Sequence, residues 1–481
     1  MKETEVASAP DLKEARKRGR LASLSKRVAD VDPSPFLIQW GAGKHYYIET
    51  FGCQMNVRDS EIIQGFLDRI GMTSIQDASQ ADLAIFNTCA IRENAEEHLW
   101  GELGHMKAYA QARPGMIVAI CGCMMQLEVP FRAVRDRYPF VNLVFGTNNV
   151  DALYPLLEDC VKNRHRVLRV ESNPGEVVEG LPSTRQEPHR GFVNITYGCD
   201  KFCTYCIVPF TRGMQRSRTA EEVIAEVRDL VRHRYKEVTL LGQNVSSYGA
   251  DLEDNPDFAE LLRLVSDTNI PRIRFMTSHP HDFTDEVFDV MAERKNIMPY
   301  LHLPIQSGSD RVLKLMNRSY DMAKYDHLVQ LVRKKVPDIA LTTDIIVGFP
   351  GETEEDFQQT LAAVRKYQYD SCFTFIFSPR PGTPAYNMKN NATKEEIQDR
   401  FNRLVDLTEA IAAEKAARMV GRVVEVLFLH PSRKDRSMMS GYDPYQHLVH
   451  VKGDESLAGQ IRKVRILESH VHSFIGELVD E

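Results

Sequence analysis

Residues 199–206 read Cys199-Asp200-Lys201-Phe202-Cys203-Thr204-Tyr205-Cys206 and follow a predicted strand at residues 192–196. This spacing does not arise by chance in a chain with nine cysteines among 481 residues. A structural zinc ion normally takes four ligands in close pairs, and Cys160 and His189 are too remote or unpatterned to complete such a set. Three thiolates can instead hold a 4Fe–4S cluster and leave one iron open to a cofactor. The segment therefore predicts an open iron–sulfur site.

The residues around this triplet alternate between strands and helices. Helices are marked by apolar residues at three-and-four spacing, and Thr219-Ala220-Glu221-Glu222 reads as a capping box. Six strand–helix repeats predict a partial (β/α)6 barrel with its chemistry at the carboxyl ends of the strands, where the triplet lies. An enclosed barrel beside an open iron suits radical formation from S-adenosylmethionine. The predicted strands span residues 192–196, 237–241, 272–276, 300–304, 341–347 and 371–377.

A second alternating region precedes the barrel. Strands are predicted at residues 46–51, 83–87, 117–120 and 141–145, with helices at about 60–70, 94–112 and 151–157. This pattern predicts a small doubly wound α/β domain of about 115 residues.

Three cysteines follow the first three strands of this domain. Cys53, Cys89 and Cys123 each come directly after a predicted strand. Carboxyl ends of parallel strands share one edge of a sheet, so we expect the three thiols to converge there. Cys121 is two residues from Cys123 and could share its face, but Cys123 lies further out along the strand and is favoured.

The remaining segments complete the domain plan. Residues 393–418 form an Ala-rich predicted helix, and four short strands after Gly421 predict a small β-barrel of the oligonucleotide-binding type. That segment has slightly more acidic than basic residues, so it shows no basic footprint for RNA. We expect residues 1–43 to be a disordered extension, although the cluster at residues 16–20 could touch RNA.

Composition narrows the class of protein. The net charge of −7 shows no global basic footprint, so any RNA contact must use local patches. The odd number of cysteines argues against a secreted disulfide framework. The longest apolar run, near residues 116–125, is too short to span a membrane, and the N-terminus does not resemble a signal peptide. We therefore expect a cytoplasmic protein.

From about residue 44 to 480, the chain resembles the radical S-adenosylmethionine methylthiotransferase family. Cys-x-x-x-Cys-x-aromatic-Cys at residues 199–206 is the superfamily signature. Within that family, the sequence is most similar to the tRNA-modifying branch. Its C-terminal segment looks like a TRAM domain. The further matching motifs start at Phe51, Asn87, Gly122, Pro209, Leu241, Thr277, Leu303 and Gly348.

The resemblance implies two 4Fe–4S clusters. One would be held by Cys53, Cys89 and Cys123, which selects Cys123 over Cys121, and the other by Cys199, Cys203 and Cys206. It implies domains at residues 44–160 (auxiliary cluster), 185–417 (radical core) and 420–481 (TRAM). It also implies that Tyr205 packs on the adenine of S-adenosylmethionine. The other implied cofactor contacts are Asn244, Gln306, Ser307, Gly348 and Glu352.

The implied reaction is methylthiolation at C-2 of N(6)-isopentenyladenosine at position 37 of tRNA. Two S-adenosylmethionine molecules would serve, one as methyl donor and one as radical source. The implied partners are the tRNA anticodon arm, a reductant such as a flavodoxin or ferredoxin, and a sulfur donor, with the enzyme a monomer. Alternative substrates are threonylcarbamoyl-adenosine tRNA and a ribosomal-protein aspartate. A non-enzyme alternative is an iron–sulfur RNA-binding or electron-transfer protein.

Overall fold

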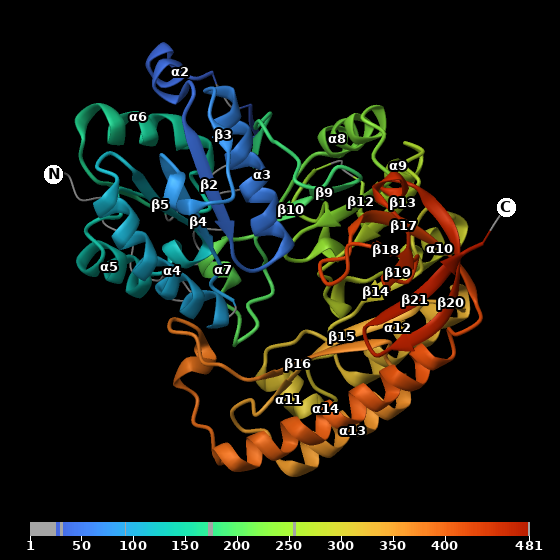
Figure 1. Ribbon diagram of the computed structural model, residues 1–481. Coiled ribbons are helices and arrows are strands. Elements are labelled where there is room, and N and C mark those ends of the chain that lie inside the picture. Colours follow the sequence, from blue (N-terminus) through green and yellow to red (C-terminus); the bar gives the residue numbers. More distant parts are fainter. Residues whose placement is uncertain (1–25, 29–31, 92, 172–176, 254–255, 480–481) are drawn as a thin grey trace. The chain divides into compact units, whose positions relative to one another are not determined.

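A computed structural model describes residues 26–28, 32–91, 93–171, 177–253 and 256–479 (Figure 1). The chain divides into two compact units. One contains the residues up to Gln186 with Thr196–Phe202 and Cys206–Arg218, and the other contains Glu187–Ile195, Cys203–Tyr205 and the residues from Thr219 onward. The cysteine triplet thus contributes residues to both units. Most of the predicted extension, including its basic cluster at residues 16–20, lies outside the described residues.

The first unit is built on a six-stranded parallel sheet in the order β3-β2-β4-β5-β6-β7. The order reverses between β2 and β4, as in other doubly wound folds, so the predicted fold of this region is confirmed. A ligand crevice is expected at that reversal. The strands are β2 (His45–Thr50), β3 (Thr73–Ser74), β4 (Leu83–Thr88), β5 (Ile117–Gly122), β6 (Leu143–Phe145) and β7 (Val167–Arg169).

Helices cover both faces of this sheet. The core on one face joins the sheet to α2 (Pro35–Gly41), α3 (Gln54–Arg69) and α6 (Leu153–Asn163). The core on the other face joins it to α4 (Glu93–Ala112) and α5 (Glu128–Arg137). The central strands β4 and β5 are buried along their whole length because both faces are covered.

Three sequence expectations need correction here. The segment expected to be disordered contains α2, where Ser34 caps the helix by accepting from the Leu37 amide and Leu37 is fully buried. α3 begins at Gln54 rather than near Ser60, because polar residues of its first turns bond within the domain instead of facing solvent. The domain also extends past residue 160, since β7 completes the sheet.

The second unit contains the barrel strands in two parallel sheets of three, ordered β13-β12-β9 and β14-β15-β16. An isolated bridge between Ile273 and Ile297 marks the approach of the two sheets. Helices wrap them into one hydrophobic core. The strands are β9 (Arg190–Asn194), β12 (Glu237–Leu241), β13 (Arg272–Phe275), β14 (Tyr300–His302), β15 (Ala340–Val347) and β16 (Ser371–Ile376). The helices are α8 (Ala220–Arg232), α9 (Phe258–Ser266), α10 (Asp285–Glu293), α11 (Asp310–Leu315), α12 (Met322–Lys335) and α13 (Glu354–Tyr367).

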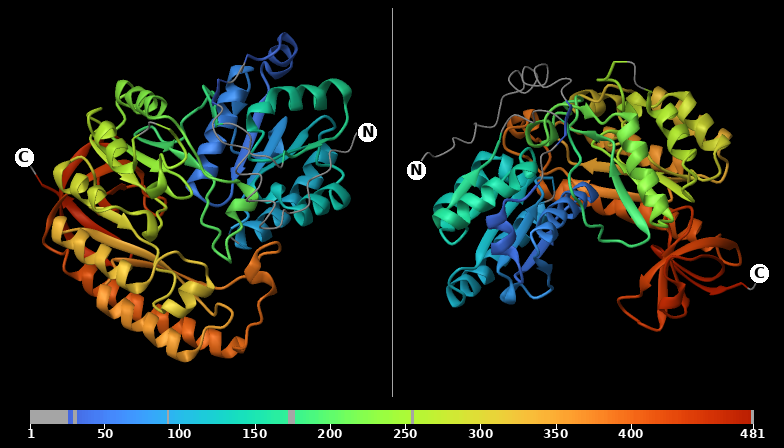
Figure 2. Two further views of the ribbon diagram at one scale, coloured as in Figure 1. Left: turned by 180° about the vertical axis from the view of Figure 1, so that it is seen from behind. Right: turned by 90° about the horizontal axis from the view of Figure 1, so that it is seen from above.

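The C-terminal region of this unit begins with α14 (Lys394–Ala417), which packs on α13 and β16. A closed five-stranded barrel follows, in the order β17-β18-β19-β21-β20, and forms the red lobe in Figure 2. The predicted small barrel is confirmed, although β18 was not predicted. Its strands are β17 (Val423–Pro431), β18 (Met438–Tyr442), β19 (Leu448–Lys452), β20 (Ile461–His470) and β21 (Ser473–Leu478).

Two buried arginines of β13 attach the small barrel. Arg272 donates to the carbonyl oxygens of Tyr442 and Glu425 at 2.9 and 3.0 Å. Arg274 donates to those of Pro444 and Asp443 at 2.9 and 2.6 Å. Its Nε also donates to Glu237 at 2.9 Å. These guanidiniums therefore bind the backbone of the barrel rather than particular side chains.

Among the helices of the described residues, none is long and apolar enough to cross a membrane.

Candidate functional site

Three cysteines lie at the carboxyl edge of the first sheet, as predicted. Cys53 follows β2, Cys89 follows β4 and Cys123 follows β5. β2 and β4 are the strands between which the sheet order reverses, so Cys53 and Cys89 flank the expected crevice. None of the nine cysteines forms a disulfide.

Two glycines let the cysteine loops approach one another. Gly52 has φ 103°, and a Cβ there would lie 2.5 Å from Cys89 Cβ and 2.7 Å from Cys89 Sγ. Gly122 has φ 98°, and a Cβ there would lie 2.4 Å from the carbonyl oxygen of Thr88. A side chain at either position would push two cysteine-bearing loops apart, so glycine is required by both backbone and space.

Cys121 and Cys123 occupy different surroundings. Cys121 lies in the core under α3 and α6 and is 1% exposed, whereas Cys123 packs with Ala90 and Ile207 at the edge of the sheet. The expected placement of Cys121 inside the domain and of Cys123 at the edge is therefore confirmed.

An arginine reaches the Cys123 thiol. Arg212 Nε donates to Cys123 Sγ at 3.0 Å, while its Nη2 donates to Asn56 Oδ1 at 2.8 Å and Asp59 Oδ2 at 2.6 Å. All four residues are buried. The Arg212–Asp59 pair also borders a small pocket of about 70 Å³ within this unit.

The electrostatics of this edge oppose bare thiolates. Burial raises the pKa of Cys123 to about 12, with Arg212 acting in the opposite direction. Burial likewise raises the pKa of Cys53. Burial favours a lower pKa for Arg212, but Asp59 and Cys123 reverse this and hold its pKa well above the usual value. Because metal ligation needs thiolates, loss of these protons is coupled to metal binding.

The donor set fits an iron–sulfur cluster. It offers three thiols and one arginine hydrogen bond to a sulfur. In the described part of the chain, no three Cys, His, Asp or Glu side chains gather closely enough for one metal ion. A four-iron cluster, which gives each thiolate its own iron, does not require such close gathering.

The triplet lies in a long loop. In the first unit, β10 (Thr196–Tyr197) pairs with β11 (Arg216–Ser217), and the Cys199 amide donates to the Gly213 carbonyl at 3.1 Å. The short helix α7 (Val208–Thr211) follows Cys206 within this loop. Phe202 adopts φ 47°, which sharply turns the chain between the first two cysteines.

In the second unit, Arg318 contacts the central cysteine. Its Nη1 donates to Cys203 Sγ at 3.3 Å and to the Tyr205 hydroxyl at 3.4 Å. Tyr205 also packs edge-on against Phe349, with ring centroids 6.4 Å apart. The Thr204 amide donates to the Met316 carbonyl at 3.0 Å, which fixes the backbone between these side chains.

Three predicted cofactor contacts follow the carboxyl ends of barrel strands. Asn244 follows β12. Its side-chain Nδ2 donates to the Asp282 carboxylate at 2.6 Å, and its Oδ1 accepts from the Ser246 hydroxyl at 2.7 Å. Gln306 follows β14 with φ 63°, and its buried Oε1 has no hydrogen-bond partner in the described residues. Gly348 follows β15 with φ 73°. A buried acceptor without a partner is consistent with a ligand at this rim.

Two other predicted contacts bond within the fold. Ser307 is fully buried, and its Oγ lies 3.3 Å from Thr360 Oγ1 on α13. Glu352 accepts from the Gly348 amide at 2.8 Å and lies 3.6 Å from Arg400 on α14. Burial raises the pKa of Glu352 to about 7. Their contact with the cofactor stays a prediction.

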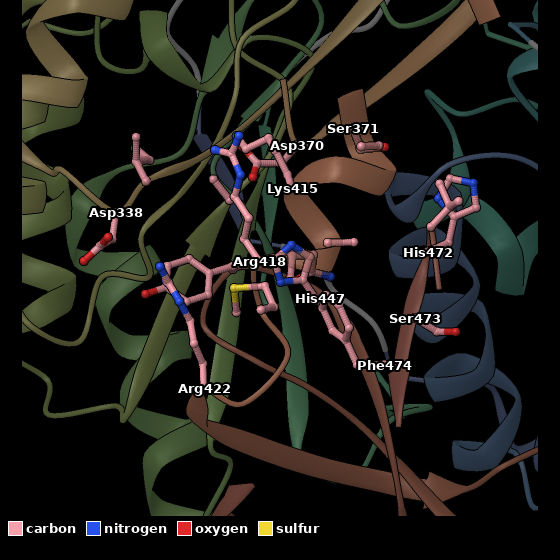
Figure 3. A pocket seen from close by; sticks show the side chains of 18 of the residues that line it. Asp338, Asp370, Ser371, Lys415, Arg418, Arg422, His447, His472, Ser473 and Phe474 are labelled. Atoms are coloured by element: carbon pink, nitrogen blue, oxygen red, sulfur yellow. The ribbon is translucent and has the colours of Figure 1, made fainter. Parts of the chain in front are cut away.

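A separate pocket of about 390 Å³ lies at the other end of the barrel strands (Figure 3). Its walls come from the residues before β15 and β16, the end of α14 and the small barrel. Its Lys415 is paired with Asp370 at 2.6 Å and its His447 with Asp443 at 2.9 Å. Both side chains are therefore paired within the protein, and Gly348 and Gln306 lie at the opposite strand ends.

Sequence reasoning missed two arginines of the described residues that contact cysteines. Arg212 lies 6 positions after Cys206 in the sequence, and Arg318 lies 115 positions after Cys203. Arg212 belongs to the matching motif that starts at Pro209, but its sulfur partner Cys123 lies 89 positions away in the sequence. Only its position in an otherwise apolar loop beside the triplet hinted at burial.

Comparisons with known proteins agree with this architecture. Residues 45–146 match the Uncharacterized protein family UPF0004, residues 193–364 the Radical SAM superfamily and residues 417–479 the TRAM domain. Among solved structures, the fold is similar to the radical S-adenosylmethionine methyltransferase TsrM from Kitasatospora setae, with cobalamin and a [4Fe-4S] cluster bound. Its TM-score is 0.54 at 14% identity, covering 71% of this chain and 74% of that one.

Curated relatives match along almost the whole chain. A tRNA-2-methylthio-N(6)-dimethylallyladenosine synthase from Geobacillus kaustophilus is 45% identical, over 99% of this chain and 90% of the relative. One of the same name from Bacillus subtilis is 44% identical, over 98% and 92%. With this identity over nearly the full length, the chain belongs to the family of tRNA-2-methylthio-N(6)-dimethylallyladenosine synthases, within the radical S-adenosylmethionine methylthiotransferases.

Proposed function

We propose that this chain is a radical S-adenosylmethionine enzyme that methylthiolates C-2 of N(6)-isopentenyladenosine at position 37 of tRNA. The observation that carries the proposal is the presence of two distinct cysteine sites in a chain 45% identical to a synthase of that name. One site gathers thiols from three strand ends, and the other has three cysteines in one loop.

We assign Cys53, Cys89 and Cys123 to an auxiliary 4Fe–4S cluster and Cys199, Cys203 and Cys206 to the radical cluster. When bound, the auxiliary group supplies sulfur for transfer, and the other supplies the electron that cleaves S-adenosylmethionine. The convergence of the first three cysteines on the sheet reversal and the hydrogen bond from Arg212 to Cys123 Sγ support the first assignment. The hydrogen bond from Arg318 to Cys203 Sγ supports the second.

The barrel rim is the proposed site of S-adenosylmethionine. Tyr205 would pack on the adenine, and Gln306 offers a buried acceptor without a protein partner among the described residues. Asn244 and Gly348 follow the carboxyl ends of β12 and β15. Ser307 and Glu352 would act from behind the rim, because both bond to the surrounding helices. An enclosed rim also keeps water from a radical.

The substrate base must leave its stack to reach such a rim, which favours the single-stranded anticodon loop over duplex RNA. The small C-terminal barrel would contribute RNA contacts through local Lys and Arg side chains and base stacking. We further propose a cytoplasmic monomer that takes electrons from a flavodoxin or ferredoxin and sulfur from a separate donor. An enzyme that modifies tRNA needs access to the cytoplasmic tRNA pool.

The decisive experiment is nucleoside mass spectrometry of tRNA from cells with and without this gene. Loss of 2-methylthio-N(6)-isopentenyladenosine, with accumulation of the form lacking the methylthio group, is the expected result. Loss of a methylthiolated threonylcarbamoyl-adenosine instead would transfer the assignment to that substrate. An unchanged tRNA profile with an unmodified ribosomal-protein aspartate would favour the protein substrate.

A further inference from the structure

We propose that Arg212 is a positioning residue for the auxiliary cluster, one that holds the Cys123 sulfur and sets the reduction potential of the cluster. The proposal rests on the assignment of Cys53, Cys89 and Cys123 as ligands made above. It adds a residue that comes not from the doubly wound domain's own sequence but from the loop that carries the triplet.

The guanidinium of Arg212 faces two kinds of partner. Its Nε donates to the sulfur of Cys123, and its Nη2 donates to the carboxylate of Asp59 and the amide oxygen of Asn56. The planar fork of arginine can make these bonds together, whereas a lysine ammonium is a single point charge. The contacts with Asp59 and Asn56 thus fix the donor that points at sulfur.

Asn56 ties this arrangement to the other cysteine loops. It is fully buried, and its Nδ2 donates to the Phe51 carbonyl at 2.8 Å and the Thr88 carbonyl at 2.9 Å. Phe51 and Thr88 immediately precede the segments that carry Cys53 and Cys89. One amide side chain therefore connects the loops after β2 and β4 to the arginine that contacts the cysteine after β5.

Burial of the Arg212–Asp59 pair carries a desolvation penalty, which argues against a purely structural role. Arg212 is 5% exposed and Asp59 is 7% exposed. Buried ion pairs often contribute little net stability, because desolvation offsets their attraction. The pair with Asp59 uses only Nη2, and the Nε hydrogen is directed at the Cys123 sulfur. Hydrogen bonds to sulfur and nearby charge are the features by which proteins tune iron–sulfur potentials.

Arg212 contacts a cysteine of the auxiliary site and also lies close in the sequence to the cysteine triplet. Arg212 lies six positions after Cys206, with α7 between them. Its own carbonyl accepts from Arg216 at 2.9 Å, and the neighbouring Thr211 carbonyl accepts from Thr147 at 2.9 Å. The segment after the triplet is therefore anchored on the domain that carries the auxiliary cysteines.

The test isolates the auxiliary cluster in the full-length chain. Cys199→Ala, Cys203→Ala and Cys206→Ala together form the parent variant, which is reconstituted anaerobically and titrated with EPR detection. Arg212→Gln in this parent should lower the equilibrium constant for reduction of the cluster at least tenfold, which lowers the reduction potential by 59 mV for a one-electron couple. The reason is the loss of a cation that favours the reduced cluster. Arg212→Lys keeps the charge and should shift the potential less, in the same direction.

Two further variants separate the effect of charge on the reduction potential from an effect on protein stability. Asp59→Asn combined with Arg212→Gln removes both charges and should shift the potential less than Arg212→Gln alone. Arg166→Gln is the matched control, because this half-buried arginine of the same domain donates to the carbonyl oxygens of Val134, Arg135, Tyr138 and Val141. It should cost stability and leave potential and EPR line shape unchanged.

The outcomes distinguish this inference from the ligand assignment. If Arg212→Gln and Arg212→Lys match the parent in potential and line shape, while Cys123→Ala abolishes the cluster, the arginine is only structural and the inference fails. If Cys123→Ala keeps a full cluster, the ligand assignment itself fails. If Arg212→Gln does not fold, Arg212→Lys decides, since an unshifted potential in that variant overturns the proposal.

Discussion

The two cysteine sites of this molecule are built by opposite means. The auxiliary site takes one cysteine from each of three loops separated by more than 30 residues, and the sheet brings them to one edge. The triplet takes its three cysteines from a single loop of eight residues. The first site therefore depends on the fold of a whole domain, whereas the ligand set of the second is already present in the local sequence.

The largest expected effect is loss of the local site. Replacing Cys199, Cys203 and Cys206 by alanine should leave about four of about eight irons per chain. It should abolish deoxyadenosine formation, because the open iron is lost. Iron analysis and chromatography after reduction measure both. Deoxyadenosine formation by the triple variant would show that the radical site lies elsewhere.

Next in size is the contrast between Cys121, in β5, and Cys123, which directly follows that strand. Cys123→Ala should deplete the auxiliary cluster, whereas Cys121→Ala should retain its iron and lose only about 1 kcal/mol of stability from altered core packing. Iron content and thermal unfolding of the two variants provide the comparison. Equal iron loss would mean that Cys121 is also a ligand.

A glycine substitution tests how far the auxiliary site depends on the close approach of the loops that carry Cys53 and Cys89. Gly52→Ala should lower occupancy of the auxiliary cluster, because the new Cβ would overlap Cys89. Gly43→Ala is the matched control, since Gly43 also has positive φ but a methyl group added there would meet nothing within 4 Å. Both should lose about 1 kcal/mol of stability from backbone strain. Equal iron content would show that the loops can separate without cost to the site.

The last prediction involves stability alone, without loss of a cluster, and concerns the barrel rim and its pH dependence. The folded carboxyl of Glu352 keeps its proton up to about pH 7, whereas the unfolded chain releases it near 4.5. Folded protein thus binds more protons in this window, so stability should fall as pH rises through it. The shift corresponds to about 3 kcal/mol at most. Unfolding measured from pH 5 to 8 should show a flatter profile for Glu352→Gln, and identical profiles would contradict the assignment.

Topology explains why much of this could be predicted. The strand-end cysteines were predictable because parallel strands place all carboxyl ends at one edge, whatever the rest of the fold does. Cys121 was expected in the interior because Cys123 lies further out along the chain, and the structure has Cys121 within β5 and Cys123 just after the strand ends.

Long-range partners explain what could not be predicted. Arg212 meets a sulfur 89 positions away, which no local pattern reports. The capping box expected at Thr219 is wrong, because its hydroxyl makes no cap hydrogen bond, whereas the similar pattern at Thr353 forms a complete capping box with Asp356. Both helices begin where expected, so periodicity located the elements while tertiary contacts decided the bonds at their ends.

The two arginines of β13 have an evolutionary consequence. Arg272 and Arg274 recognise main-chain carbonyls of the C-terminal barrel, and every amino acid supplies such a carbonyl. The side chains of the barrel are thus free to change while the joint stays intact. Recombination could exchange this appended domain between related enzymes, provided that the incoming backbone has the same shape at residue 425 and at residues 442–444.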